Sequence, residues 1–435
     1  MNIRFYHAKI LILKKEKEFS ILEGELWIKG NKIVYIGDGS DTKRIYEDMD
    51  IPYIRWDREI DAKGNVLMPG FKNAHTHTAM TFLRSYADDL PLQEWLQKKV
   101  FPMEAKLTHE DIYELCRLGI LEYLTSGITT GFDMYIDPVA IAKASKDCGF
   151  RMMQTSGLND FTQSLEAVEE QFYQINEMSD LTGFVLGFHA EYTTGKKLLE
   201  GVANLAQKLK SPVWLHNAET KKEVEECKNR YGKTPTELTD ALGMYAYGGG
   251  GYHCIYFEDK DFEIYKNKGL TAVTCPASNL KLASGIAFVH HFLQDGISMA
   301  IGTDGAASNN CLDMFREMFL VSGLAKVQGK DASLVSAEEV LYMATTGGAR
   351  AMGLDACDSL AEGKLADLIM VDLQQPNMQP ENNFVKNIVY SGSKQNVLLT
   401  MIDGKILYEK QKFDIGIDPK EVYEKANAII RRMTK

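Results

Sequence analysis

The sequence predicts an α/β protein in which a (β/α)₈ barrel is joined to a small β-sandwich formed from both chain termini. The barrel is predicted because eight strand-like runs alternate with amphipathic, helix-length segments over about 290 residues. Chemically useful side chains also fall at or just past the ends of these runs, where TIM barrels carry their catalytic groups. The eight runs span residues 66–75, 127–134, 151–158, 183–190, 212–219, 251–257, 270–276 and 297–304.

Both ends of the chain differ from this middle. Ile33–Ile36 is a short strand introduced by a turn at Lys29–Lys32, and similar strands with turns follow after about Asp355. The final stretch, Lys420 to Met433, has helical spacing. We therefore expect one small β-sandwich domain from residues 1–67 with 356–435, and a barrel domain from residues 68–355.

The helical segments within the middle include Asp137 to Cys148 and Thr194 to Leu209. The competing fold is an open doubly wound sheet, which would favour a Gly-x-Gly-x-x-Gly turn after an early strand, and no such turn occurs. Gly248–Gly251 precedes a strand and does not open a helix. We interpret it as a loop or a close-packing run and not as a phosphate-binding turn.

The composition is that of an ordinary globular protein. The chain has 435 residues, 45% apolar and 25% charged, which argues against long disorder. Its net charge of −11 argues against a nucleic-acid surface and against binding to an anionic membrane. The seven cysteines form no Cys-x-x-Cys pair, and neither a signal peptide nor a membrane-spanning run is evident. We expect a soluble, cytoplasmic protein with a small-molecule substrate.

A metal site is predicted first by His75 and His77, which lie two residues apart on an extended segment. Side chains at this spacing point the same way, so the two imidazoles converge. His216 and Asp304 lie at the ends of later strands and complete a set of three imidazoles and one carboxylate. This set suits a borderline divalent cation, most often zinc. Because no lysine lies within 183–190 to bridge two metals, we expect one ion per chain.

Further residues could turn such a site into a hydrolase. A zinc ion lowers the pKa of bound water to about 7 and so supplies hydroxide at neutral pH. Glu219 follows His216 by three residues and could carry the proton from water to the leaving group. His253 could orient the hydroxide or polarise the electrophile, and Asp304 could both bind metal and accept a proton. These residues predict a metal-dependent hydrolase.

At this point the sequence resembles the amidohydrolase superfamily, and within it the 5-methylthioadenosine/S-adenosylhomocysteine deaminase group with its chlorohydrolase and guanine deaminase relatives. The resemblance implies a mononuclear zinc site and hydrolytic loss of ammonia from a purine carbon. It covers nearly the whole chain. The matching stretches are Pro69–His77, Leu90–Leu96, Phe101–Glu104, Gly127–Thr130, Leu215–Glu219, Cys275–Lys281, Gly302–Asn310 and Gly363–Leu368.

The same resemblance implies a substrate-binding set. Glu104 would hold ribose hydroxyls, His189 would contact the substrate and Trp95 would form a wall of the pocket. Ser308, within Gly302–Asn310, joins this set together with Glu219 and Asp304.

Two features depart from the group. His253 is preceded by four glycines and Tyr252 where relatives are apolar. The group also often places arginines between strand 3 and the strand that carries His189, to meet an amino-acid carboxylate. From Thr155 to Phe188 this chain has neither Arg nor Lys. This departure favours uncharged adenosine derivatives such as methylthioadenosine over S-adenosylhomocysteine.

Two alternatives stay open. A zinc hydrolase of the same fold could act on guanine, a triazine or another cyclic amidine, but a ribose clamp at Glu104 would serve no purpose for a free base. A catalytically silent assembly or binding protein is the second alternative, and the intact ligand set with Glu219 argues against it. The sequence does not decide whether the chain forms a homo-oligomer.

Overall fold

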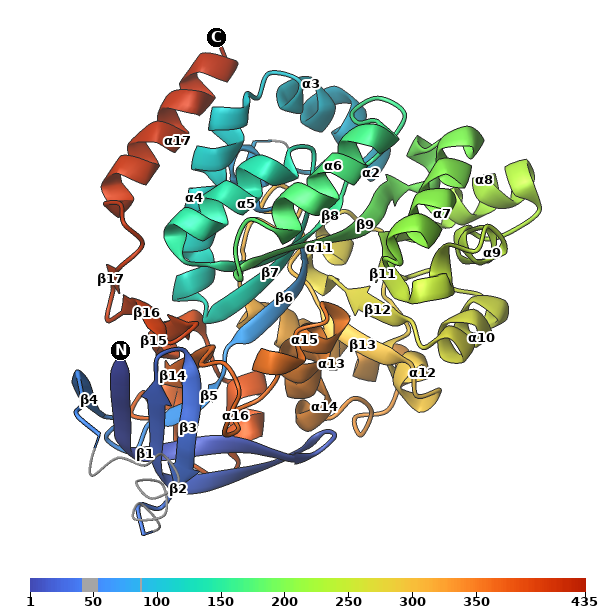
Figure 1. Cartoon of the computed structure of the whole chain (residues 1–435). Coiled ribbons are helices and arrows are strands. Elements are labelled where there is room, and N and C mark those ends of the chain that lie inside the picture. Colours follow the sequence, from blue (N-terminus) through green and yellow to red (C-terminus); the bar gives the residue numbers. More distant parts are fainter. Residues whose placement is uncertain (41–53, 87) are drawn as a thin grey trace.

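The structure is a computed structural model that describes residues 1–40, 54–86 and 88–435. It contains two β-sheets: a parallel barrel surrounded by helices, and a mixed sheet to which both ends of the chain contribute (Figure 1). The predicted combination of a (β/α)₈ barrel with a small β domain from both termini is confirmed. In the described part of the chain, no helix combines the length and apolar character needed to cross a membrane.

The barrel places eight strands side by side in the order of the sequence, each parallel to the next. The amide of Asp304 donates to the carbonyl of His75 over 3.0 Å, which brings the two ends of the sheet together. The strands are β6 (Phe71–Thr76), β7 (Ile128–Tyr135), β8 (Arg151–Ser156), β9 (Thr182–Ala190), β10 (Val213–Asn217), β11 (Gly249–His253), β12 (Thr271–Thr274) and β13 (Ser298–Ile301).

Helices cover the outside of this barrel, and two of them match the segments expected from the sequence, α5 (Pro138–Cys148) and α7 (Lys196–Leu209). Asp137 caps α5 by accepting a hydrogen bond from the amide of Ala140. The other barrel helices are α4 (His109–Thr125), α6 (Leu165–Asn176), α8 (Lys221–Tyr231), α9 (Pro235–Ala241), α10 (Asp259–Lys268), α11 (Pro276–Lys281), α12 (Val289–Gln294), α13 (Met314–Gly329), α14 (Ala337–Tyr342) and α15 (Gly348–Ala351).

A series of short helical turns follows β6 and covers the carboxyl ends of the strands. These turns are η1 (Thr78–Leu83), α2 (Leu92–Trp95), η2 (Leu96–Val100) and α3 (Phe101–Glu104). After the barrel come α16 (Phe384–Tyr390) and α17 (Pro419–Met433), the latter matching the helix expected near the C-terminus.

The terminal sheet has nine strands in the order β17-β16-β15-β14-β5-β1-β2-β3, with β4 also paired to β1. It closes on its own apolar core, which includes Phe5, Leu26 and Leu399. The pairing therefore forms one continuous sheet around the core of the expected small sandwich. The strands are β1 (Asn2–Lys15), β2 (Glu18–Lys29), β3 (Lys32–Gly37), β4 (Arg58–Asp61), β5 (Val66–Pro69), β14 (Leu368–Val371), β15 (Val397–Ile402), β16 (Lys405–Glu409) and β17 (Lys412–Phe413).

The structure divides the expected strand at 66–75 into two. Val66–Pro69 pairs with β14 in the terminal sheet, and the barrel begins only at Phe71. A Cβ on Gly70 would lie 2.1 Å from Thr129 Cγ2, so only glycine allows the chain to pass between the two sheets here. The proposed boundary between residues 67 and 68 lies inside β5, and the division into domains stays a proposal.

The glycine run belongs to β11 and packs closely against neighbouring strands. A Cβ on Gly250 would lie 2.0 Å from the carbonyl oxygen of Thr271, and one on Gly251 would lie 2.6 Å from the Tyr265 hydroxyl oxygen. The close-packing interpretation is confirmed. The strand ends at His253, whereas a longer strand was expected to residue 257.

Candidate active site

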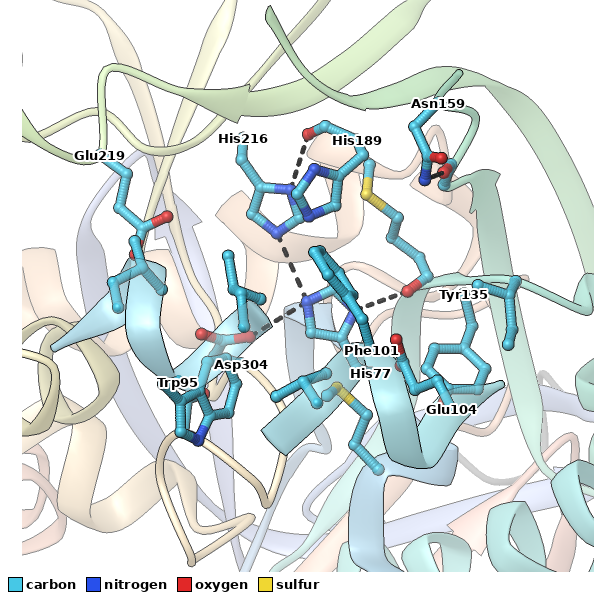
Figure 2. A pocket seen from close by; sticks show the side chains of 18 of the residues that line it. His77, Trp95, Phe101, Glu104, Tyr135, Asn159, His189, His216, Glu219 and Asp304 are labelled. Atoms are coloured by element: carbon cyan, nitrogen blue, oxygen red, sulfur yellow. Dashed lines mark hydrogen bonds and ion pairs between the residues drawn. The ribbon is translucent and has the colours of Figure 1, made fainter. Parts of the chain in front are cut away.

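One cavity at the carboxyl ends of the barrel strands gathers nearly all the residues singled out by the sequence (Figure 2). It encloses about 770 Å³, including the open solvent at its mouth, a volume typical of small-molecule sites. His75 lies beneath it, fully buried. The expected site residues that line the cavity are His77, Trp95, Glu104, His189, His216, Glu219, His253, Asp304 and Ser308.

The four expected metal ligands converge at this cavity, which three of them line. His77 Nε2 lies 3.2 Å from Asp304 Oδ1 and 3.4 Å from His216 Nε2. His75 Nε2 lies 3.7 Å from the same Asp304 oxygen. Ligand atoms of His75, His77 and Asp304 all lie within 4.8 Å of one another, as do those of His75, His216 and His253.

Hydrogen bonds orient two of the imidazoles toward a common point. His77 Nδ1 is 2.5 Å from the carbonyl oxygen of Met134, and His216 Nδ1 is 2.7 Å from that of His189. Each carbonyl accepts the Nδ1 proton, which leaves the Nε2 lone pairs facing each other. Two lone pairs at this separation repel unless a cation or a proton lies between them.

Unpaired ring nitrogens and shifted pKa values decide whether this set of four residues fits a metal. Both ring nitrogens of His75 are buried without a hydrogen-bond partner in the described residues. Burial lowers the pKa of His75 and of His216, so both are neutral, as metal ligands must be. Burial opposes ionisation of Asp304, but the neighbouring His77 and the other surrounding histidines hold its pKa well below the usual range. The donor set fits a divalent metal.

The ends of the strands are held in unusual backbone conformations. Ala218, His253, Cys254 and Asp304 have left-handed φ values of 51°, 70°, 48° and 57°. Such conformations are costly for residues other than glycine and cluster at functional sites. The turn at Ala218 is fixed because its carbonyl accepts from the amides of Ile255 and Tyr256.

Glu219 is only 5% exposed and lines the cavity, although its position before α8 also suits a solvated helix start. Ser284 Oγ donates to its Oε1 over 3.3 Å, and His253 Nε2 lies 4.0 Å from its Oε2. Burial raises its pKa, while His253 moderates the rise. A carboxyl group in this environment accepts a proton more readily than one in water.

Hydrogen bonds from α11, the helix that follows β12, support two of these groups. Asn279 Oδ1 lies 2.7 Å from His253 Nδ1, and Ser278 Oγ donates to Asp304 Oδ2 over 2.6 Å. The buried carboxylate of Glu317 on α13 accepts from the amide of Ala277 at 3.0 Å and from Asn309 Nδ2 at 2.7 Å. Sequence reasoning assigned no role to these residues, although Ser278 and Asn279 lie in a stretch that carried the resemblance.

The expected substrate residues come from opposite walls of the cavity. Trp95 and Glu104 lie on the helical turns α2 and α3, while His189 ends β9 and Ser308 follows β13. Desolvation raises the pKa of Glu104 to about 7. His189 Nδ1 is 2.9 Å from Thr193 Oγ1, which fixes its ring at the cavity wall.

One strand-end acid does not line the cavity. Asp133 Oδ2 accepts from the amide of Thr78 over 2.6 Å and so holds the turn after His77. Sequence reasoning also assigned no role to part of the wall, whose residues lie on the short helical turns after β6, on loops and, for Tyr135, at the end of β7. The additional lining residues include Leu92, Leu96, Val100, Phe101, Tyr135, Ile136, Asn159, Thr162, Tyr192 and Leu282.

Apart from its histidines, the charged side chains in the described lining of this cavity are all acidic. Its described lining contains the carboxylates of Glu104, Glu219 and Asp304 but neither Lys nor Arg. Lysines of the adjoining segments are paired elsewhere, Lys281 with Asp88 and Lys98 with Glu94. Apart from its histidines, the cavity offers no cationic side chain to an anionic group of a substrate.

The fold and the site together define a barrel hydrolase whose histidine–aspartate cluster fits a divalent metal. The chain belongs to the amidohydrolase family, whose model matches residues 66–407.

Relatives match over almost the whole chain. A protein named 5-methylthioadenosine/S-adenosylhomocysteine deaminase from Caldanaerobacter subterraneus is 35% identical, covering 97% of this chain and 96% of that protein. One of the same name from Thermococcus sibiricus is 40% identical, over 89% and 90%. The crystal structure of a zinc-bound adenosine deaminase from Xanthomonas campestris has a TM-score of 0.91 and 31% identity, covering 99% of this chain and 98% of that one.

Proposed function

We propose that this protein is a zinc-dependent deaminase that converts 6-aminopurine ribonucleosides with an uncharged 5′ substituent to the inosine product and ammonia. The observation that carries this proposal is the presence of Glu104 and Glu219 in one cavity. One carboxylate suits the hydroxyls of a sugar, and the other suits proton transfer at a reacting ring. The names of the relatives and the zinc-bound structural neighbour support the same conclusion.

His75, His77, His216 and Asp304 would hold one zinc ion per chain. The metal would activate water for attack at neutral pH. The described strand β9 contains no lysine that could bridge a second ion.

The residues of the chain supply the proton transfers. Glu219 accepts a proton from the attacking water and delivers it to the purine ring nitrogen beside the carbon under attack. The ionised carboxylate of Asp304 accepts a hydrogen bond from this water, and His253 holds the water oxygen in line with that carbon. The second proton of the water passes by way of Asp304 to the amino group, which leaves as ammonia, and the ring keeps the oxygen of the water.

The 5′ end of the substrate would face an apolar wall that includes Leu92, Leu96, Val100 and Leu282. An amino-acid arm, as in S-adenosylhomocysteine, would place a carboxylate where the described lining offers neither Lys nor Arg. Burying a carboxylate without a partner is costly. Methylthioadenosine would therefore be preferred.

The test is an ammonia-release assay with methylthioadenosine, S-adenosylhomocysteine, adenosine and free guanine. We expect the highest kcat/KM with methylthioadenosine and a lower value for its 2′-deoxy analogue. Glu104→Ala should reduce that difference. A preference for free guanine, or indifference to the 2′-hydroxyl, would contradict the proposal.

A further inference from the structure

Tyr135 ends β7 and lines the cavity with a hydroxyl that has no hydrogen-bond partner. Its side chain is only 4% exposed. Among the described residues that line the cavity, only Tyr135 has a buried side-chain polar atom left unpaired. A buried phenol without a partner costs free energy, and such a group facing a cavity points to a ligand that pairs with it.

The Tyr135 hydroxyl lies beside the carboxylate of Glu104, which reaches the cavity from a separate segment, α3 (Figure 2). This proximity moderates the rise in the pKa of Glu104 caused by burial, but no hydrogen bond of ordinary geometry joins the two groups. Glu104 also forms no ion pair with a described Lys or Arg. Burial raises the pKa of Tyr135 well above its usual value, so the phenol keeps its proton.

The two groups therefore offer complementary hydrogen bonds at one place. Once ionised, above its pKa of about 7, the Glu104 carboxylate only accepts, whereas the protonated phenol can donate. A pair of adjacent hydroxyl groups satisfies both, because both hydroxyls can donate to the carboxylate while the oxygen of one of them accepts from the phenol. An apolar group, or a lone acceptor, would satisfy only part of this arrangement.

We propose that Tyr135 is a specificity-determining residue whose hydroxyl donates to one of the two sugar hydroxyls that Glu104 accepts from. This inference rests on the proposed function and adds a second protein group to the recognition of the ribose. A substrate that lacks the contacted hydroxyl would leave the phenol and one carboxylate lone pair unpaired together. Discrimination against that deoxy substrate should exceed what Glu104 alone supplies.

The experiment compares wild type with Tyr135→Phe on methylthioadenosine and its 2′-deoxy and 3′-deoxy analogues. We expect kcat/KM for the ribonucleoside to fall about tenfold, with a change below about twofold for the one analogue that lacks the contacted hydroxyl. Tyr245→Phe is the matched control, since Tyr245 also has a buried, unpaired hydroxyl but does not line this cavity. It should leave all three values unchanged.

A second measurement and a second variant keep the result decisive. Calorimetric binding of the inosine product and its deoxy analogues to Tyr135→Phe should show the same loss of discrimination. If Tyr135→Phe does not fold, Tyr135→Leu replaces it. Unchanged ratios between the ribonucleoside and both deoxy analogues would overturn the role of Tyr135. Absence of deamination by wild type with any 6-aminopurine nucleoside would instead contradict the proposed function, and the calorimetric comparison would still test Tyr135.

Discussion

His253 Nδ1 lies 2.7 Å from Asn279 Oδ1, and this contact joins the end of β11 to α11, the helix that follows the neighbouring strand β12. The amide oxygen accepts the Nδ1 proton and so leaves Nε2 free to face the cavity, 4.0 Å from Glu219 Oε2. The role that we propose for His253 therefore depends on a residue that touches neither substrate nor metal.

Replacing Asn279 tests this dependence. Asn279→Leu should lower kcat about 10–100-fold, because Nδ1 of His253 loses its acceptor and the ring its fixed orientation. Asn279→Asp keeps an acceptor and should recover much of the activity. Equal losses in both variants, with unchanged thermal stability, would show that the hydrogen bond has no part in positioning His253.

Metal content tests the ligand set. His75→Ala should remove the metal and the activity together, because the ring is fully buried among the other ligands. Elemental analysis should give close to one zinc ion per chain in wild type and almost none in the variant. The control is His109→Ala, whose half-exposed ring pairs with Asp137 and does not belong to the cluster. Two tightly held ions in active wild type would contradict the mononuclear site.

Glu219→Gln tests proton transfer. The amide keeps the shape of the side chain but cannot accept a proton, so turnover should fall about 10²–10⁴-fold while fold and metal content remain. Glu225→Gln, an exposed position on α8, should behave as wild type. Wild-type turnover in purified Glu219→Gln would remove Glu219 from the mechanism.

The apolar wall proposed to face the 5′ end of the substrate can be tested by adding a positive charge near it. Thr162 lies at the mouth of the cavity, in a segment without Lys or Arg. Thr162→Arg should raise the ratio of kcat/KM for S-adenosylhomocysteine to that for methylthioadenosine about tenfold, since the guanidinium can pair with the carboxylate. Thr162→Gln, which is long but neutral, serves as the control. A wild-type enzyme that already prefers S-adenosylhomocysteine would contradict the argument from charge.

A buried ion pair joins the two sheets and predicts a stability effect. Arg151 on β8 donates to Asp367 over 2.6 Å, just before β14. Asp367→Asn should destabilise the protein by about 3–5 kcal/mol at pH 7, because it leaves a buried arginine poorly paired. Glu94→Gln, in an exposed pair, should change the melting temperature little.

The pH dependence of this pair has a definite sign. Burial opposes ionisation of Asp367, but Arg151 holds its pKa below the usual value. The pair therefore stabilises the fold above the unfolded pKa of about 3.9, and this contribution is lost as the pH falls through the lower folded pKa. The difference in melting temperature between wild type and Asp367→Asn should shrink toward pH 3. A constant difference would show that the carboxylate charge is not involved.

The barrel and the clustering of the proposed ligands could be predicted from the sequence because both follow from local spacing. His75 lies in β6, and His77 follows two residues later, just past its end. His216 and Asp304 lie at or just past the ends of other strands. The division at Gly70 could not be predicted from an uninterrupted apolar run, since it depends on contact with Thr129. Likewise, Tyr135 faces Glu104 only because α3 folds over the cavity, a long-range arrangement that no local pattern encodes.

The most direct test of the central claim is the ammonia released from methylthioadenosine by the purified, zinc-loaded protein. We predict that ammonia and methylthioinosine form in equal amounts, that chelation abolishes both and that zinc restores them. Failure to release ammonia from any 6-aminopurine ribonucleoside, or full activity after complete removal of the metal, would contradict the account.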